Sequence, residues 1–263
     1  MIPRRPYGNI STVVRYRWLL YELVVRDLTL RYRGSVLGFA WTLLNPVLFM
    51  LVYTLVFSVY LKSSIHAFPL FLLSGLIPWM WASNAIAQAV TVILDGRAYV
   101  GKTLMPTELL VLVPVLSNGI NFLITTLLLF PVSIALSVNV GWAVAFLPLL
   151  LVVELCIILG ISLLVATFNV FYRDLQQFVG YALMALFFLT PIFYSRDDVP
   201  AKLQFLVRWS PFAALISAYQ DVFYYGTPPS WRAVLFAGAF GAVILAIGLW
   251  CFNRSHDAFG EYV

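Results

Sequence analysis

Between Val14 and Tyr32 the apolar side chains recur at intervals of three and four residues. This spacing lines them along one face of an α-helix, while Arg15, Glu22 and other charged side chains fall on another side. A helix with two such faces lies in the interface between membrane and water. We therefore expect residues 1–33 to form a basic, amphipathic interface segment. It is either a plain juxtamembrane anchor or an element that moves with a cytoplasmic partner.

After this segment the apolar positions become continuous. Residues 36–60 carry no charged side chain, and this length exceeds the roughly 20 residues that a helix needs to cross the bilayer core. Pro46 inside this run is expected to kink the helix and to free a carbonyl that a neighbouring helix must satisfy. The same reasoning along the chain predicts six transmembrane helices, at residues 36–60, 69–94, 108–138, 142–171, 175–194 and 233–252.

Residues 195–230 do not fit this pattern. Charged side chains interrupt the apolar positions, and only ten residues, from Pro211 to Gln220, separate Ser210 from Asp221, which is too short to span a bilayer. Ser210 suits the N-cap of a helix and Pro211 suits its first residue. We expect one or two re-entrant or interfacial helices here, on the outer side between spans five and six. A polar cytoplasmic tail, residues 253–263, is expected after the last span.

Composition supports an all-α integral membrane protein with a single transmembrane domain over residues 1–263. The chain is 62% hydrophobic and only 10% charged, against about 25% charged in soluble domains. The apolar runs are also too long for the strands of a membrane barrel. Eleven of the 16 Lys and Arg residues fall in segments on the same side as the N-terminus, so we expect both termini in the cytoplasm. This excess accounts for the net charge of +5 without a nucleic-acid partner.

The sequence offers little for catalysis. It has no nucleophile paired with a base and no metal-ligand spacing, so no cofactor or metal is expected on this chain. Gly101-Lys102-Thr103 resembles the end of a phosphate-binding loop, but no strand precedes it. Glu154 is a carboxylate inside a span, where ionisable groups are costly, and both a structural hydrogen bond and a functional role remain open. A membrane-embedded lipid-linked sugar transferase with Glu154 or Asp221 as base is the remote alternative.

Aromatic residues make up 16% of the chain. Tryptophans near the span ends, such as Trp41, Trp79 and Trp81, are first read as interface belts. Aromatic pairs such as Phe187-Phe188 and Phe193-Tyr194 also suit stacking on sugar rings, although packing against lipid accounts for most such residues. Gly34 and Gly38 have the spacing of a helix-packing motif, and they equally suit a turn.

Several motifs together resemble one protein family. They are Arg26-Asp27-Leu28, RYRGSVLG from Arg31 to Gly38, Leu44-Asn45-Pro46, LSGLIPW from Leu73 to Trp79, NVFYRDL from Asn169 to Leu175, and TPIFY from Thr190 to Tyr194. In this order, over essentially the whole chain, they resemble the ABC-transporter permeases that export polysaccharides. These are the Wzm-like O-antigen permeases and the related teichoic-acid and capsule permeases.

The resemblance implies a homodimer in the bacterial cytoplasmic (inner) membrane, surrounded by membrane lipid. Two copies of a separate ABC ATPase subunit, which bind ATP and Mg, would dock from the cytoplasm, so the chain itself would not be an enzyme. The implied substrate is a lipid-linked polysaccharide. An ABC permease for a small molecule or drug is the nearest alternative.

The resemblance also suggests roles for individual residues. The segment that couples to the ATPase would comprise Asp95, Gly96, Arg97, Ala98, Tyr99 and Val100, with Arg173 and Asp174 as a second, smaller contact. The interface segment would be a gate helix that uses Arg26, Asp27, Arg31 and Arg33. Candidates for the translocation path and the outer gate are Trp41, Tyr53, Phe187, Phe188, Tyr194, Pro211, Tyr219, Asp221 and Tyr224.

Overall fold

The computed structural model describes residues 14–96 and 106–262, and every regular element within these ranges is helical, which confirms the predicted fold class. The α-helices are α2 (Arg17–Tyr32), α3 (Trp41–Thr54), α4 (Phe68–Asp95), α6 (Glu108–Thr126), α7 (Leu129–Ala135), α8 (Leu147–Phe171), α9 (Leu175–Leu189), α10 (Gln204–Arg208), α11 (Pro211–Phe223) and α12 (Trp231–Tyr262). Shorter 3-10 or π segments are η1 (Gly38–Ala40), η2 (Leu55–Tyr60), η3 (Gly141–Phe146) and η4 (Arg196–Asp198).

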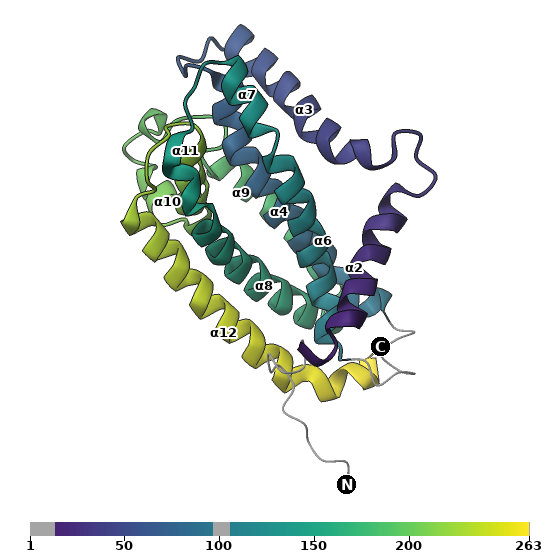
Figure 1. Ribbon diagram of the computed structural model, residues 1–263. Coiled ribbons are helices and arrows are strands. Elements are labelled where there is room, and N and C mark those ends of the chain that lie inside the picture. Colours follow the sequence, from purple (N-terminus) through teal and green to yellow (C-terminus); the bar gives the residue numbers. More distant parts are fainter. Residues whose placement is uncertain (1–13, 97–105, 263) are drawn as a thin grey trace.

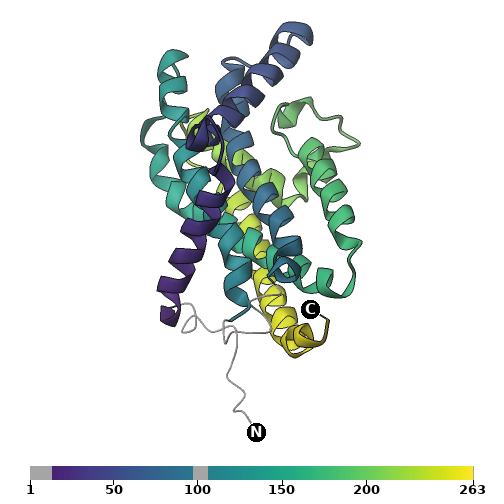
Figure 2. The ribbon, with the colours of Figure 1, turned by 90° about the vertical axis from the view of Figure 1, so that its right-hand side faces the viewer.

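The long helices form one bundle around α4 and α8 (Figure 1). α12 follows α8 along one side, α6 lies against α4, and α2 packs beside the lower part of α6. α11 inserts between α4, α8 and α12 at the upper end, and most of its side chains are buried. α9 stands on the opposite flank from α2 (Figure 2). The region between the last two spans therefore folds back into the bundle.

Five stretches of the described chain are long and apolar enough to cross a membrane: Gly38–Tyr60, Phe68–Asp95, Glu108–Ala135, Gly141–Phe171 and Trp231–Ser255. α9 is the sixth apolar helix, and at 15 residues it is shorter than predicted. Its end at Leu189 has a local cause, because Thr190 precedes Pro191 and is extended (ψ 135°). The chain bends from Thr190 to Tyr194, where the predicted span had continued.

Two other predicted segments differ in detail from the helices of the structure, although Glu108–Ala135 still counts as one apolar stretch. The span predicted over 108–138 is interrupted between α6 and α7, where Leu127 and Leu128 make 3-10 bonds to Ile124 and Thr125. Pro131 has no N–H for the Leu127 carbonyl, which explains the interruption. The tail predicted from residue 253 is helical, since α12 continues to Tyr262.

α2 differs from the single amphipathic face that its sequence suggests. Trp18 and Tyr21 of the predicted apolar stripe are exposed, whereas Leu20 and Val24 are buried against Leu109 of α6. The helix thus has one apolar face against the bundle and a second apolar face available to lipid.

The turn from α2 to α3 uses both glycines of the Gly34-x-x-x-Gly38 spacing. Gly34 has φ +78° and Gly38 has φ +49°, a backbone region that favours glycine, and a Cβ on either residue would meet nothing within 4 Å. The spacing therefore serves a turn here, not helix packing. Tyr32 and Thr42 close the turn through a hydrogen bond of 2.6 Å between their hydroxyls.

Pro46 frees a carbonyl in α3, as the sequence predicts. Because Pro46 has no N–H, the Thr42 carbonyl loses its partner within the helix. The Thr125 hydroxyl of α6, which donates to Asn121 O at 2.6 Å, also approaches Thr42 O at 3.4 Å. A neighbouring helix thus helps to satisfy the freed carbonyl.

α8 and α12 come close enough for their backbones to touch. A Cβ on Gly160 of α8 would lie 2.6 Å from Leu245 N, and one on Gly248 of α12 would lie 2.6 Å from Gly160 O. Only glycine fits at such a crossing, and small residues are typical of packed membrane helices. This pair is the closest packing between long helices that the described glycines report.

Two of the predicted interface tryptophans are part of the core. Trp79 is 5% exposed and lies against Phe187 and Phe212, with ring centroids 6.0 and 5.7 Å away. Trp81 is 6% exposed and donates its Nε1–H to Val115 O at 3.0 Å. The interface-belt interpretation was therefore wrong for these two, whose indoles pack between helices.

Candidate functional site

An aromatic cluster joins α3, η2, α9 and the bends that follow α9. Its members are Tyr53, Phe57, Phe187, Phe188, Phe193 and Tyr194. Phe193 is the central ring, with centroids 4.9 Å from Phe57, 5.6 Å from Phe187 and 5.3 Å from Tyr194. The break at Thr190-Pro191 carries Phe193 back against η2. Four predicted path residues, Tyr53, Phe187, Phe188 and Tyr194, are thus brought together.

The other predicted path residues lie elsewhere. Trp41 is exposed at the first turn of α3, and Pro211 begins α11. Tyr224 follows α11 and donates its hydroxyl to His66 O at 2.7 Å, which ties α11 to the loop before α4. Tyr219 is only 1% exposed and lies inside the bundle. Its position fits a role within the core, not on the surface of a path.

Glu154 and Tyr219, which the sequence analysis treated separately, form one buried pair. The Tyr219 hydroxyl donates to Glu154 Oε2 at 2.6 Å, and this bond joins α8 to α11. Glu154 is 1% exposed, and its Oε1 has no hydrogen-bond partner among the described residues. This buried carboxyl links α8 to α11.

The helix α11, which lies between the last two spans, begins as predicted. The Ser210 hydroxyl caps α11 by accepting from Ala213 N at 3.2 Å, and Pro211 is the first helical residue. Asp221 near the end of α11 accepts from Ser230 N at 3.3 Å, which fastens the link to α12. Burial raises the pKa of the Asp221 carboxyl, and the Ser230 N–H and the charge of Arg196 oppose that rise.

Arg31 is the centre of a polar clamp between α2 and the bundle, formed with Asp27, Gln88, Ser117 and Asn118. Its guanidinium donates to Asp27 Oδ2 at 2.5 and 2.9 Å within α2. It also reaches Gln88 Oε1 of α4 at 2.6 Å, and Ser117 Oγ and Asn118 Oδ1 of α6, both at 2.9 Å. The planar fork of arginine suits this division among three helices.

The remaining gate-helix candidates are not part of the clamp. Arg26 and Arg33 are exposed, and Arg33 is the C-cap of α2. Of the four residues assigned to the gate helix, the structure therefore brings together Asp27 and Arg31. Their ion pair spans one helical turn and is itself partly exposed.

The candidate coupling residues divide into two groups. Asp95 is exposed at the end of α4, and Gly96 is its C-cap, while Arg97, Ala98, Tyr99 and Val100 lie outside the described residues. Arg173 and Asp174 are exposed in the short link between α8 and α9. The end of α4 and this link lie at the same end of the bundle (Figure 1).

Sequence reasoning missed several residues that organise these groups. Phe57 was not singled out, and Phe193 was noted only as half of an aromatic pair. The density of aromatic residues was the available signal for both. Gln88, Ser117 and Asn118 were not singled out either. Their sequence distance from Arg31, 57 to 87 residues, gave no hint of the clamp.

A bundle of apolar helices with internal polar contacts defines a multi-pass membrane protein. The ABC-2 type transporter family matches residues 19–224, and the chain belongs to this family. It is 32% identical to an O-antigen export system permease protein of Myxococcus xanthus, over 97% of this chain and 98% of that protein. It is 29% identical to one from Klebsiella pneumoniae, over 92% and 94%. A polysialic acid transport protein of Escherichia coli is 24% identical, over 90% and 93%.

Proposed function

We propose that this chain is the membrane-spanning permease subunit of an ATP-driven ABC exporter. Its substrate is a lipid-linked polysaccharide of the O-antigen, teichoic-acid or capsule type, which it moves from the cytoplasmic side across the bacterial inner membrane. The observation that carries the proposal is similarity over nearly the whole chain to permeases named for O-antigen export. The excess of Lys and Arg on one side supports an orientation with both termini in the cytoplasm.

The proposal includes a homodimer with a path between the two copies. In the Gly38–Tyr60 stretch only 11% of the most apolar window is buried, against 78% for α4. Much of α3 is thus unpartnered within one chain, and the aromatic cluster lies along its edge. Aromatic faces stack well on sugar rings, and a second copy would turn this edge into a wall of the path.

The energy would come from two copies of a separate ABC ATPase subunit that binds ATP and Mg²⁺. The exposed Arg173 and Asp174, at the same end as Asp95, support docking at that end. Replacing Arg97 and Tyr99 with Ala is expected to weaken ATPase docking while leaving membrane insertion intact. Normal co-purification of the ATPase with that double variant would refute the assigned coupling segment.

The structure gives little support to the rival transferase function. A general base must reach the proton that it removes, yet Glu154 is enclosed with Tyr219 and Asp221 is engaged with Ser230 N. Both carboxylates have structural partners within the chain. No observation specifically favours the alternative of an ABC permease for a small molecule or drug.

The direct test is co-expression with the products of neighbouring genes, followed by purification in mild detergent. We expect an ATPase to co-elute with the permease at two copies to two, and we expect the pair to restore surface polysaccharide in a strain that lacks its own permease. A chain that purifies alone and restores no polymer would refute the proposal.

A further inference from the structure

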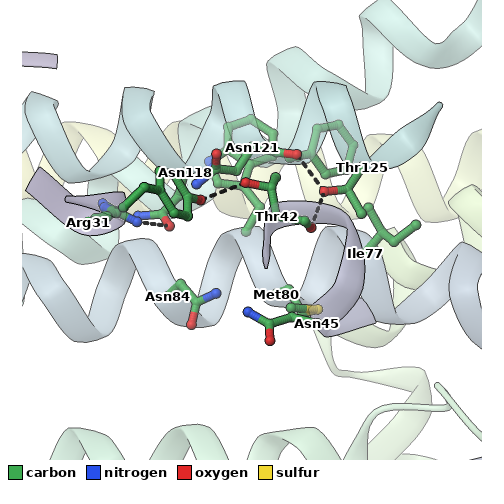
Figure 3. A pocket seen from close by; sticks show the side chains of 12 residues that line it. Arg31, Thr42, Asn45, Ile77, Met80, Asn84, Asn118, Asn121 and Thr125 are labelled. Carbon is green, nitrogen blue, oxygen red and sulfur yellow. Dashed lines mark hydrogen bonds between the residues drawn. The ribbon is translucent and has the colours of Figure 1, made fainter. Parts of the chain in front are cut away.

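α2, α3, α4 and α6 enclose a polar pocket of about 230 Å³ beside the Arg31 clamp (Figure 3). Amides and hydroxyls dominate its walls, among them Asn45 of α3, Asn84 of α4, and Asn121 and Thr125 of α6. The pocket is open on the side of Asn45 and Asn84, which are both exposed. No role in the resemblance or in the proposed function accounts for it.

Three of these amides have hydrogen-bonding capacity to spare. Asn45 and Asn84 make no side-chain hydrogen bond within the described residues, and Figure 3 shows both amides beside the open pocket. Asn121 Oδ1 is buried and has no partner there either. An unpaired amide in an apolar surrounding costs about 1–3 kcal/mol. Such a group persists where water or a polar ligand satisfies it.

The pocket lies deep within the span. Asn84 lies 11 residues before Asp95, the end of α4, which is about 16 Å along the helix at 1.5 Å per residue. A bilayer core is about 30 Å thick, so Asn84 is near the middle of the span. Polar side chains at this depth face a water-filled cavity or a substrate path more often than lipid.

The charge of the walls indicates the class of ligand. Arg31 is the cation at the pocket, and Asp27, a turn earlier on α2, neutralises it through the ion pair. Arg31 also donates to Gln88, Ser117 and Asn118. An anion would compete with Asp27 and with these three partners for the guanidinium. Amides, which both donate and accept, instead match neutral hydroxyl groups, which do the same.

The floor of the pocket adds an apolar face. Trp81 and Phe122 line it, with ring centroids 5.0 Å apart and planes at 32°. A sugar ring combines hydroxyls at its edge with C–H groups on its faces, and it can use amides and aromatic rings together. The volume is below the range of about 300–1,000 Å³ that drug-sized ligands occupy, so the pocket suits one ring at a time.

We propose that this pocket is a binding subsite for a single neutral sugar unit of the transported chain, held by Asn45, Asn84 and Asn121 over the Trp81 and Phe122 floor. The inference rests on the proposed function, since it names a contact made by the exported polymer. It places a sugar contact inside one subunit, next to the α2 clamp, in addition to the path between two copies.

The first experiment separates hydrogen bonding from size. In a strain that lacks its own permease, the wild-type chain with its ATPase tests the proposed function by restoring surface polymer. The double variant Asn45→Ala, Asn84→Ala is compared with Asn45→Ser, Asn84→Ser, which differs from it only by two hydroxyls. We expect export to fall at least tenfold with Ala and to stay within about twofold of wild type with Ser. Asn253→Ala, an exposed amide on α12, is the matched control.

The second experiment measures occupancy of the pocket in the purified complex. Met80 lines the pocket, and Met80→Cys in a chain with Cys156→Ala and Cys251→Ala gives one reporter thiol. We expect oligosaccharides released from the strain's own polymer by mild acid to slow labelling by a water-soluble thiol reagent at least threefold. Inorganic pyrophosphate, the anionic comparison, should not slow it.

The outcomes distinguish the two proposals. Failure of the wild-type chain to restore polymer counts against the proposed function, whereas the labelling result decides the pocket separately. Export by the double Ala variant at the wild-type level, or a labelling rate that oligosaccharides leave unchanged, would overturn the subsite. Protection by pyrophosphate alone would assign the pocket to an anion instead.

Discussion

α12 and α3 are both peripheral helices, yet they are held in different ways. In their most apolar windows only 22% and 11% of the residues, respectively, are buried. α12 nevertheless packs against α8 through glycines, so that the two backbones are in contact at Gly160 and Gly248. α3 is instead held by polar contacts at Thr42 and by the ring of Tyr53, whose centroid is 6.0 Å from that of Phe187. The kind of contact that a helix makes therefore indicates how firmly it is held better than its share of buried residues does.

The largest loss of stability is expected when a methyl group is introduced between α8 and α12. Gly160→Ala places a Cβ 2.6 Å from Leu245 N, and because backbone cannot rotate away as a side chain can, we expect a loss of about 3 kcal/mol in unfolding free energy. Gly238→Ala on α12 is the matched control, since its Cβ would meet only Val153 at 3.7 Å. Denaturant unfolding of the purified protein measures both. Equal stability of the two variants would contradict the close pair.

The next largest loss of stability is expected from removing the Glu154–Tyr219 hydrogen bond, which joins α8 to α11. Glu154→Ala leaves the buried Tyr219 hydroxyl without its acceptor and opens a cavity, so we expect a loss of about 2 kcal/mol. Glu154→Gln keeps an acceptor and should cost less than about 1 kcal/mol. Unfolding midpoints in detergent measure the difference. A Gln variant as unstable as the Ala variant would show that the carboxylic group itself is required.

A smaller effect is expected from trimming the exposed face of α3. Leu48 and Val52 lie one turn apart and are both exposed, so Leu48→Ala with Val52→Ala should change the stability of one chain by less than about 0.5 kcal/mol. If a second copy packs there, the dimer should dissociate about tenfold more readily, or about 1.4 kcal/mol. Sedimentation in detergent measures this equilibrium.

The control for α3 is the same pair of residue types on α12. Leu235 and Val243 are exposed as well, and changing both to Ala should leave association unaltered. If the two double variants weaken association equally, or if neither does, α3 is not the side on which copies meet.

The smallest effect comes from Asp221, beside the start of α12. Its pKa is raised in the folded protein by burial, so the folded state holds its proton more tightly than the unfolded state. That contribution to stability is present below the ordinary pKa of about 3.9 and is lost as pH rises through the raised value. Relative to wild type, Asp221→Asn should therefore gain stability as the pH rises from about 4 through the raised pKa of Asp221. A constant difference across that range would contradict the shift.

Local sequence signals predicted the parts of this fold that local chemistry determines. Continuous apolar runs located the spans, and Ser210-Pro211 located the start of α11 because capping depends on adjacent residues. The Pro191 signal that ends α9 was also present, but it was outweighed by the apolar residues that follow. Hydropathy alone cannot tell a break from a continuing span.

Contacts between distant segments could not be predicted in this way. The sequence marked Arg31 as a gate residue, but it did not indicate that Arg31 would reach Gln88 and Asn118. Trp79 and Trp81 were interpreted as interface residues because they were placed near span ends, and the packing of α4 against its neighbours buries them instead. The partners of Glu154 and Arg31 depend on how helices meet, which no local pattern records.

The glycine turn after α2 has a mechanical consequence. Close backbone packing at Gly160 and Gly248 leaves α8 and α12 little room to move relative to each other. Gly34 and Gly38 are open to rotation, because a Cβ placed on either residue would meet nothing within 4 Å. If α2 swings during a transport cycle, these two residues form the hinge. The hydrogen bonds from Arg31 to Gln88 and Asn118 must then break before α2 can swing.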